Sequence, residues 1–279
     1  MKHIKTLAAA LSALGMLAVA APSQAAPSLT FTDNGTTYTV DPFGGFDWQS
    51  NATAISTTPV FDGATVSTTT YLASAEAIKL AGGPSWAGSG LGSNYEFTIK
   101  ATILEKQTCN AWSGAVGTST CLNATFTAVG GSFAIYFDQN VNASLTTGTG
   151  FLDGTLIISG NILPGLAGGF FVTGTNAGTG VFNFAADVDF TNVDSTKDAY
   201  FNPALDTSNA VATLQIGGNT TDWTPPTTWV DGGGIPTNPL IFQADGNQTF
   251  QAVPEPASLA LVGLALAGLG YSRRRRNQA

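Results

Sequence analysis

The sequence predicts an all-β protein, a single antiparallel β-sandwich or jelly roll. Three observations lead to this prediction. Apolar and polar residues alternate over short stretches, and clusters of Gly, Asn, Asp and Pro separate these stretches. Charged residues make up only 10% of the chain, so Thr, Ser and Asn supply most of its polarity. Threonine and aromatic residues favour strands, whereas Gly and Asn favour turns. Residues 26–252 are enough for one large β domain with its own core.

Individual strands follow from period-two alternation. Tyr95, Phe97, Ile99, Ala101 and Ile103 share one predicted strand face, opposite Glu96, Thr98, Lys100 and Thr102. The same pattern recurs over 133–137 and 182–190, and the Asn34-Gly35 pair indicates a two-residue hairpin. Residues 71–81 are the one stretch with a helical pattern, and they fit a strand nearly as well. Further strands are expected at 65–70, 124–129, 155–159, 170–173, 211–216 and 240–242. Glycine-rich boundaries are expected at 130–131, 148–150 and 231–234. The region of Pro225-Pro226 and 232–239 is interpreted as a long loop that leads to the last strand.

The N-terminus has the pattern of an export signal. Lys2 and Lys5 precede an apolar stretch at 7–21, and the small residues around Ala25 suit signal peptidase. We expect a signal helix at residues 1–25, which the Sec machinery would export and signal peptidase would cut between Ala25 and Ala26. An uncleaved N-terminal anchor is the alternative.

The C-terminus, residues 253–279, has three parts in a fixed order. These are Pro254, Glu255 and Pro256, then an uncharged segment at 257–271, then Arg273, Arg274, Arg275 and Arg276. The apolar segment is shorter than the ~20 residues of a comfortable span, and the arginines would stay in the cytoplasm. A short apolar helix of this kind suits transient retention at the inner membrane, with an ordinary membrane anchor as the alternative.

This tail resembles the PEP-CTERM sorting signal. The resemblance implies that an exosortase, a membrane-embedded cysteine transpeptidase, removes the tail near Pro254-Glu255-Pro256. It also implies that the protein is secreted or displayed on the surface of a Gram-negative bacterium. The body of the chain is similar to flocculation-associated PEP-CTERM proteins at 43–48, 131–138, 151–157 and 180–184. That second resemblance implies a non-enzymatic protein that helps cells aggregate in secreted polysaccharide, in flocs or biofilm.

The charge of residues 26–252 excludes several functions. This region holds four lysines, 17 acidic residues, no arginine and no histidine, a net charge of −13. Such a surface repels nucleic acid. Without histidine, neither a Ser-His-Asp nor a Cys-His arrangement can form, nor a histidine-ligated metal site. Carboxylate chemistry remains, but Glu96 and Glu105 are expected on solvent-facing positions. We therefore expect no enzyme, with a carboxylate-dependent glycan-degrading enzyme or a lectin-like module as the alternative.

One acidic stretch could hold calcium, the only cofactor that the sequence suggests. Asp187 and Asp189 share a predicted strand face, and Asp194 and Asp198 follow shortly after. Loops with this density of oxygen ligands can bind Ca²⁺, although the EF-hand spacing is absent. Bound calcium would let the acidic protein bridge to an anionic exopolysaccharide. The alternative is a solvated strand face that leads into an acidic loop.

Two further residue types have structural interpretations. Cys109 and Cys121 are the only cysteines, and an exported chain with an even number favours a disulfide between them. The tryptophans lie beside Gly, Ser, Pro or Asp, where they would either offer platforms to sugar rings or cap the ends of the sandwich. We expect caps. These tryptophans are Trp48, Trp86, Trp112, Trp223 and Trp229.

Overall fold

The structure, a computed structural model, describes residues 27–58, 60–116, 120–174, 177–188, 200–202, 209–216 and 225–250. The expected signal helix and the C-terminal tail lie outside these ranges. Every regular element that the structure describes is a β-strand, which confirms the all-β prediction. Residues Ala26–Gln251 form one compact unit. Within the described ranges, no helix has the length and apolarity needed to cross a membrane.

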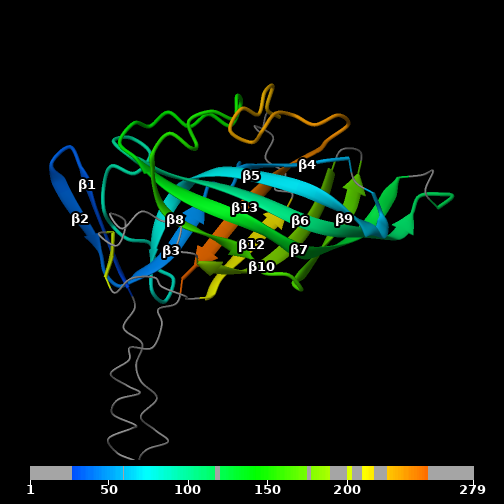
Figure 1. Cartoon of the computed structure of the whole chain (residues 1–279), viewed down its shortest axis with the longest axis horizontal. Coiled ribbons are helices and arrows are strands. Elements are labelled where there is room, and N and C mark those ends of the chain that lie inside the picture. The colour runs from blue at the N-terminus through cyan, green and yellow to red at the C-terminus, as the bar shows by residue number, and fades with distance from the viewer. Residues whose placement is uncertain are drawn as a thin grey trace, which may run out of the picture. The chain divides into compact units, whose positions relative to one another are not determined.

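The strands differ widely in length, and the longest three are consecutive in the chain (Figure 1). In chain order they are β1 (Ser28–Asp33), β2 (Thr36–Val40), β3 (Phe43–Trp48), β4 (Thr53–Ser56), β5 (Asp62–Leu80), β6 (Glu96–Trp112), β7 (Cys121–Asp138), β8 (Thr155–Ile162), β9 (Ala167–Gly174), β10 (Ala177–Val188), β11 (Phe201–Asn202), β12 (Asn209–Ile216) and β13 (Leu240–Thr249).

The larger sheet is antiparallel throughout and closes on itself. Its strands follow the order β12-β10-β8-β7-β6-β5-β3-β13, and β13 then pairs with β12. Closure leaves fewer free strand edges than two separate sheets would have. The antiparallel pairing was predicted, whereas the closure was not. Alternation of apolar and polar residues indicates only that one face of a strand is buried. One face is buried both in a sandwich and in a closed sheet.

Two segments differ from their expected structure. Residues 71–81, which had a helical pattern, belong to β5 as far as Leu80, because Tyr71, Ala73 and Ala75 face inward with period two and the strand pairs with β6 and β3. Strand β7 runs straight through Gly130-Gly131, where a break was expected. A bulge pairs Leu104 with Gly130 and Glu105 with Ala128. The extra residue lets the strand continue while its inward-facing positions change from even to odd numbers.

A small sheet, β11-β1-β2, packs against the large one through aromatic rings. The Asn34-Gly35 hairpin is confirmed, with φ angles of 45° and 80° and Asp33 opposite Thr36. Phe31 of β1 lies 4.9 Å from Tyr95 and 5.2 Å from Phe137, measured between ring centroids. These contacts fix β1 beside the end of β7, which is where the candidate site lies.

Candidate ligand pocket

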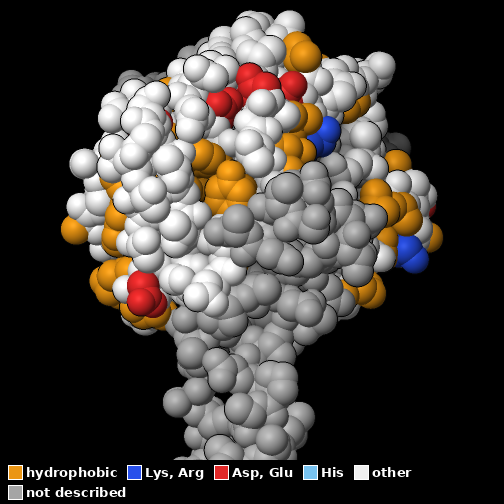
Figure 2. All heavy atoms as spheres, turned by 60° about the vertical axis from the view of Figure 1, so that its left-hand side comes forward, with side chains coloured by type: hydrophobic (Ala, Val, Ile, Leu, Met, Phe, Trp, Pro, Cys, Tyr) orange, Lys and Arg blue, Asp and Glu red, His pale blue; other side chains and the backbone are white. Residues whose placement is uncertain are grey.

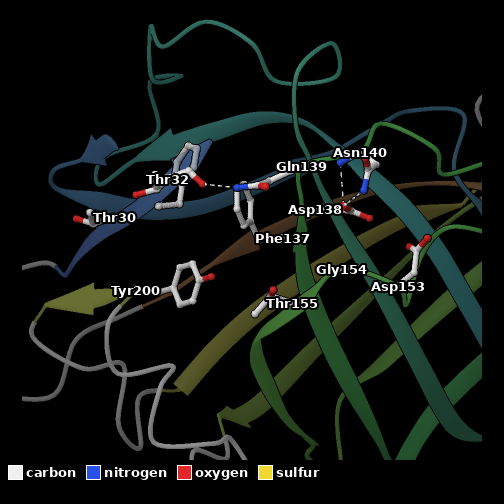
Figure 3. Close-up of a pocket in the computed structure, with 11 residues that line it drawn as sticks. Thr30, Thr32, Phe137, Asp138, Gln139, Asn140, Asp153, Gly154, Thr155 and Tyr200 are labelled. Carbon is white, nitrogen blue, oxygen red and sulfur yellow. Dashed lines mark hydrogen bonds between the residues drawn. The ribbon is translucent and has the colours of Figure 1, made fainter. Parts of the chain in front are cut away.

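A cavity of about 510 Å³ opens between β1, the end of β7 and the start of β8. Figure 3 shows side chains from these three elements, and from Tyr200, around it. Most of its lining is polar and uncharged. The lining residues are Thr30, Phe31, Thr32, Phe137, Asp138, Gln139, Asn140, Asp153, Gly154, Thr155 and Tyr200.

One wall is formed by the edge of β1 that faces away from β2. The backbone N–H of Thr30 donates to the carbonyl oxygen of Tyr200 at 2.7 Å, just before β11. Further along the same edge, Gln139 Nε2 donates to the carbonyl oxygen of Thr32 at 2.9 Å. These two bonds tie three distant segments of the chain together around the cavity.

Two carboxylates occupy the opposite wall (Figure 3). Asp138 ends β7 and is only 7% exposed. Its Oδ1 accepts hydrogen bonds from the backbone N and Nδ2 of Asn140, at 2.8 and 3.3 Å. Asp153 is exposed, and its Oδ2 accepts from Asn142 Nδ2 at 3.0 Å. Gly154 lets the segment before β8 approach the end of β7 closely, since a Cβ there would lie 2.6 Å from the carbonyl oxygen of Phe137.

A third carboxylate, Glu96, lies beneath this wall and anchors it. Glu96 lies opposite Asp138 in the register of β6 and β7. Its Oε1 accepts hydrogen bonds from the backbone N–H groups of Asn142 and Ala143, at 2.8 and 2.9 Å. Burial raises the pKa of Glu96, the two hydrogen bonds oppose this, and the charges of Asp138 and Asp153 add to the rise. Glu96 therefore holds the loop between β7 and β8 in place rather than lining the cavity.

The prediction that Glu96 and Glu105 face solvent is wrong, since each is only 3% exposed. Glu96 does lie on the outer face of β6, but the β7–β8 loop covers that face. Glu105 points into the closed sheet instead, with Ile103 and Gln107. Of the two carboxylates, the structure brings only Glu96 close to the cavity.

A second loop, residues 225–239, also covers the outer face of the large sheet. It contains the residues that were predicted to form a long loop. In Figure 1 this loop lies beside the β7–β8 loop, above β5 and β6. Asp231 joins the two loops, because its Oδ2 accepts from the N–H of Phe151 at 2.7 Å and its carbonyl oxygen accepts from Lys100 Nζ at 2.6 Å. Phe151 and Trp229 are buried beneath the loops with Leu72 and Ile55. The two loops therefore share a small hydrophobic core that is separate from the main core of the protein.

The tryptophans mostly serve as packing residues. Trp48 and Trp229 are 2% and 1% exposed, and Trp86 and Trp112 are half-buried. Trp223 lies outside the described residues. Burial speaks against Trp48 and Trp229 as sugar platforms, but neither is shown to cap an end of the sheet. Trp48 belongs to strand β3, and Trp229 packs in a small cluster with Phe151 and Leu72.

The disulfide between Cys109 and Cys121 is confirmed. The two Cα atoms are 5.8 Å apart, near the end of the β6–β7 hairpin. The calcium prediction remains untested, because only the backbone of Asp187 is described and Asp189, Asp194 and Asp198 lie outside the described ranges. Among the residues that are described, no group of three or more His, Cys, Asp or Glu side chains is placed to hold a metal ion.

Sequence reasoning missed the cavity, although it singled out parts of the lining. Asp138 and Asp153 lie in the segments 131–138 and 151–157, on which the expected resemblance to flocculation-associated proteins was based. Both carboxylates lie next to a strand end, in Phe-Asp-Gln-Asn and Leu-Asp-Gly. The sequence does contain one indication of the site. Polar residues follow the end of β7 and precede the start of β8, and these two strands pair with each other.

Comparison with curated proteins and with solved structures found no match. Residues 252–276 match the family described as the PEP-CTERM protein-sorting motif. The match spans the Pro-Glu-Pro element, the apolar segment and the four arginines, the parts on which the sequence prediction rested. The chain therefore carries a PEP-CTERM sorting motif, which implies export to the cell envelope or surface and sorting by an exosortase.

Proposed function

We propose that this protein is a non-enzymatic component of the cell surface or extracellular matrix, and that it associates with exopolysaccharide and promotes flocculation or biofilm formation. The observation that carries the proposal is a polar cavity in a protein sorted to the cell exterior. Secreted polysaccharide is the polymer that an exported matrix protein meets, and its hydroxyl groups match a lining of hydroxyl, amide and carboxylate groups.

The charge of the protein supports an uncharged partner. Figure 2 shows a face on which acidic side chains form small groups, lysines are scattered, and most atoms are neither charged nor hydrophobic. With a net charge of −13 over residues 26–252, simple ion pairing to an acidic polymer is unfavourable. Calcium held near Asp187 and the acidic stretch after it could reverse this repulsion, and chelation would then abolish the binding.

A deletion strain provides the direct test. We expect that loss of this protein reduces floc or biofilm formation, and that expression of the full chain restores it. The control is complementation with a chain that ends at residue 252, which lacks the sorting motif. Normal flocs in the deletion strain would contradict the proposal.

One observation favours an alternative, a glycan-degrading enzyme. Asp138 and Asp153 line the same cavity, and glycosidases use two carboxylates, one of which has a raised pKa. However, the carboxyl beside the cavity with a raised pKa is Glu96, which already accepts two backbone hydrogen bonds. Release of reducing ends from isolated matrix polymer, lost in both Asp138→Asn and Asp153→Asn, would establish the enzyme. We expect no release.

A further inference from the structure

We infer that the cavity between β1, β7 and β8 binds a neutral sugar residue of the polysaccharide, directly and without a bridging metal ion. The inference rests on the proposed function and assigns the site and the class of sugar. A volume of about 510 Å³ falls within the ~300–1,000 Å³ range of small-ligand sites. It therefore has room for a small saccharide.

The hydrogen-bonding groups suit hydroxyl groups on neighbouring carbons of a sugar. Asp138 is over nine-tenths buried, and its Oδ1 is bonded to Asn140, but its Oδ2 accepts no hydrogen bond from the described residues. Because Asp138 lines the cavity, this oxygen is an acceptor that a ligand hydroxyl can reach. Hydrogen bonds to a carboxylate are about twice as strong as those between neutral groups.

Amide and hydroxyl groups around the cavity complete the set. Asn140 and Gln139 can both donate and accept, and Tyr200 and Thr155 add hydroxyl groups, as Figure 3 shows. The half-buried ring of Tyr200 packs against Phe137, with centroids 6.3 Å apart, and offers apolar surface to the C–H face of a sugar ring.

The charges around the cavity select against acidic sugars. Its lining has two carboxylates, with Glu96 buried behind them, and no lysine or arginine among the described residues that form it. A uronic acid or a phosphorylated sugar would bring another negative charge into this partly desolvated site. A neutral sugar avoids that repulsion and still supplies the donors that the carboxylates need.

The experiment uses the protein exported by the producing strain, and matrix polysaccharide from the deletion strain separated by anion exchange into neutral and acidic fractions. Cosedimentation is measured with and without EDTA. We expect binding to the neutral fraction that EDTA does not change. Asp138→Asn and Asp153→Asn should each weaken it about tenfold or more.

The matched control is Glu76→Gln, which makes the same charge change at an exposed position of β5 outside the cavity. It should bind like the wild type. Asp153 is exposed, so its variant should fold, and thermal unfolding would check this. Binding to the acidic fraction alone and only without EDTA would overturn the inference in favour of a calcium bridge.

Three other outcomes would overturn the inference. These are no binding to either fraction, binding that both aspartate variants retain, and equal loss in Glu76→Gln. Floc formation separates this inference from the proposed function. If the deletion strain fails to form flocs but the Asp138→Asn and Asp153→Asn chains restore them fully, the matrix role stands and the pocket assignment falls. If the deletion strain forms normal flocs, the matrix role falls, whatever the pocket binds.

Discussion

Glu105 is a buried acid in the interior of the closed sheet, away from the candidate pocket. Its Oε1 accepts from Thr69 Oγ1 at 2.8 Å and from Gln107 Nε2 at 2.9 Å. Gln107 is fully buried, and its Oε1 has no hydrogen-bond partner among the described residues. Burial raises the pKa of Glu105, and the two hydrogen bonds only partly oppose it. The neutral acid is therefore the form that the fold favours.

This residue makes stability depend on pH in a defined direction. Because the pKa is raised in the folded state, the folded protein holds its proton at pH values where the unfolded chain has lost it. The free energy of unfolding should fall as the pH rises from about 4.5, the ordinary value, through the raised pKa. Glu105→Gln keeps an acceptor oxygen for both hydrogen bonds and removes the titration. We expect the variant to be more stable than the wild type at pH 7.5, by about 1–3 kcal/mol.

Urea unfolding at several pH values would measure this. Glu76→Gln, at an exposed position of the same sheet, is the control for the change in net charge. A stability difference between Glu105→Gln and the wild type that stays constant from pH 4 to pH 8 would contradict the prediction.

At the scale of elements, β7 depends on two adjacent glycines that serve different purposes. Gly130 and Gly131 have φ angles of 152° and 141°, which L side chains rarely adopt. A Cβ on Gly131 would lie 2.2 Å from the carbonyl oxygen of Thr102, whereas a Cβ on Gly130 would meet nothing within 4 Å. Gly130 thus supplies conformational freedom alone, and Gly131 also allows β6 and β7 to approach each other at the bulge.

Alanine at these two positions should separate the two effects. Both variants strain the backbone, which costs about 1–2 kcal/mol. Gly131→Ala should lose about 1–3 kcal/mol more, because its methyl group overlaps a strand backbone that cannot move freely. Chemical denaturation of the two variants, with the wild type as reference, would give the difference. Equal losses would show that the approach at Gly131 has no energetic consequence.

The disulfide joins β6 and β7 near the hairpin end. On the chain-entropy argument, closing a loop of this length stabilises the fold by roughly 3 kcal/mol. The double variant Cys109→Ser/Cys121→Ser should therefore lower the melting temperature by about 6–12 °C. Wild-type protein in reductant should melt at the same temperature as the variant. An unchanged melting temperature would mean that the rest of the β6–β7 ladder already fixes this hairpin.

The elements that could be predicted are those with a local cause. Asn34-Gly35 specifies its hairpin, and the alternation from Tyr95 to Ile103 specifies the buried face of β6, because both depend on neighbouring residues only. Passage of β7 through Gly130-Gly131 was not predictable, since it depends on the partner strand that supplies Leu104 and Glu105 across the bulge. The burial of Glu96 was missed for a similar reason, because a loop almost fifty residues later in the chain covers it.

The pocket illustrates the limit of local reasoning. Asp138 ends β7 and Asp153 lies just before the neighbouring strand β8, but Thr30 and Tyr200 come from distant parts of the sequence and meet only through the β11-β1-β2 sheet. The sequence could predict that polar residues end β7 and begin β8. It could not predict that β1 would lie against them, because the ring contacts of Phe31 create that placement.

At the scale of the whole molecule, the folded unit and the sorting motif occupy separate parts of the sequence. Residues Ala26–Gln251 form one compact unit, and the matched motif spans 252–276. Every strand that the structure describes, and every residue that lines the pocket, precedes the motif. Removal of the tail near Pro254-Glu255-Pro256 would therefore take away no part of the closed sheet. It would remove all four arginines of the chain, which leaves the acidic region without its basic tail.

We predict that the mature extracellular protein lacks Arg273 to Arg276. Replacement of Pro254, Glu255 and Pro256 by alanine should leave the tail attached and keep the protein in the membrane fraction, because the apolar segment and the arginines would then hold it there. Mass spectrometry of C-terminal peptides from the medium and the membrane fraction would measure both effects. Asn277→Ala, beyond the arginines, is the control and should be processed like the wild type. Extracellular wild-type protein with an intact C-terminus would contradict exosortase removal, as would normal processing of the triple-alanine variant.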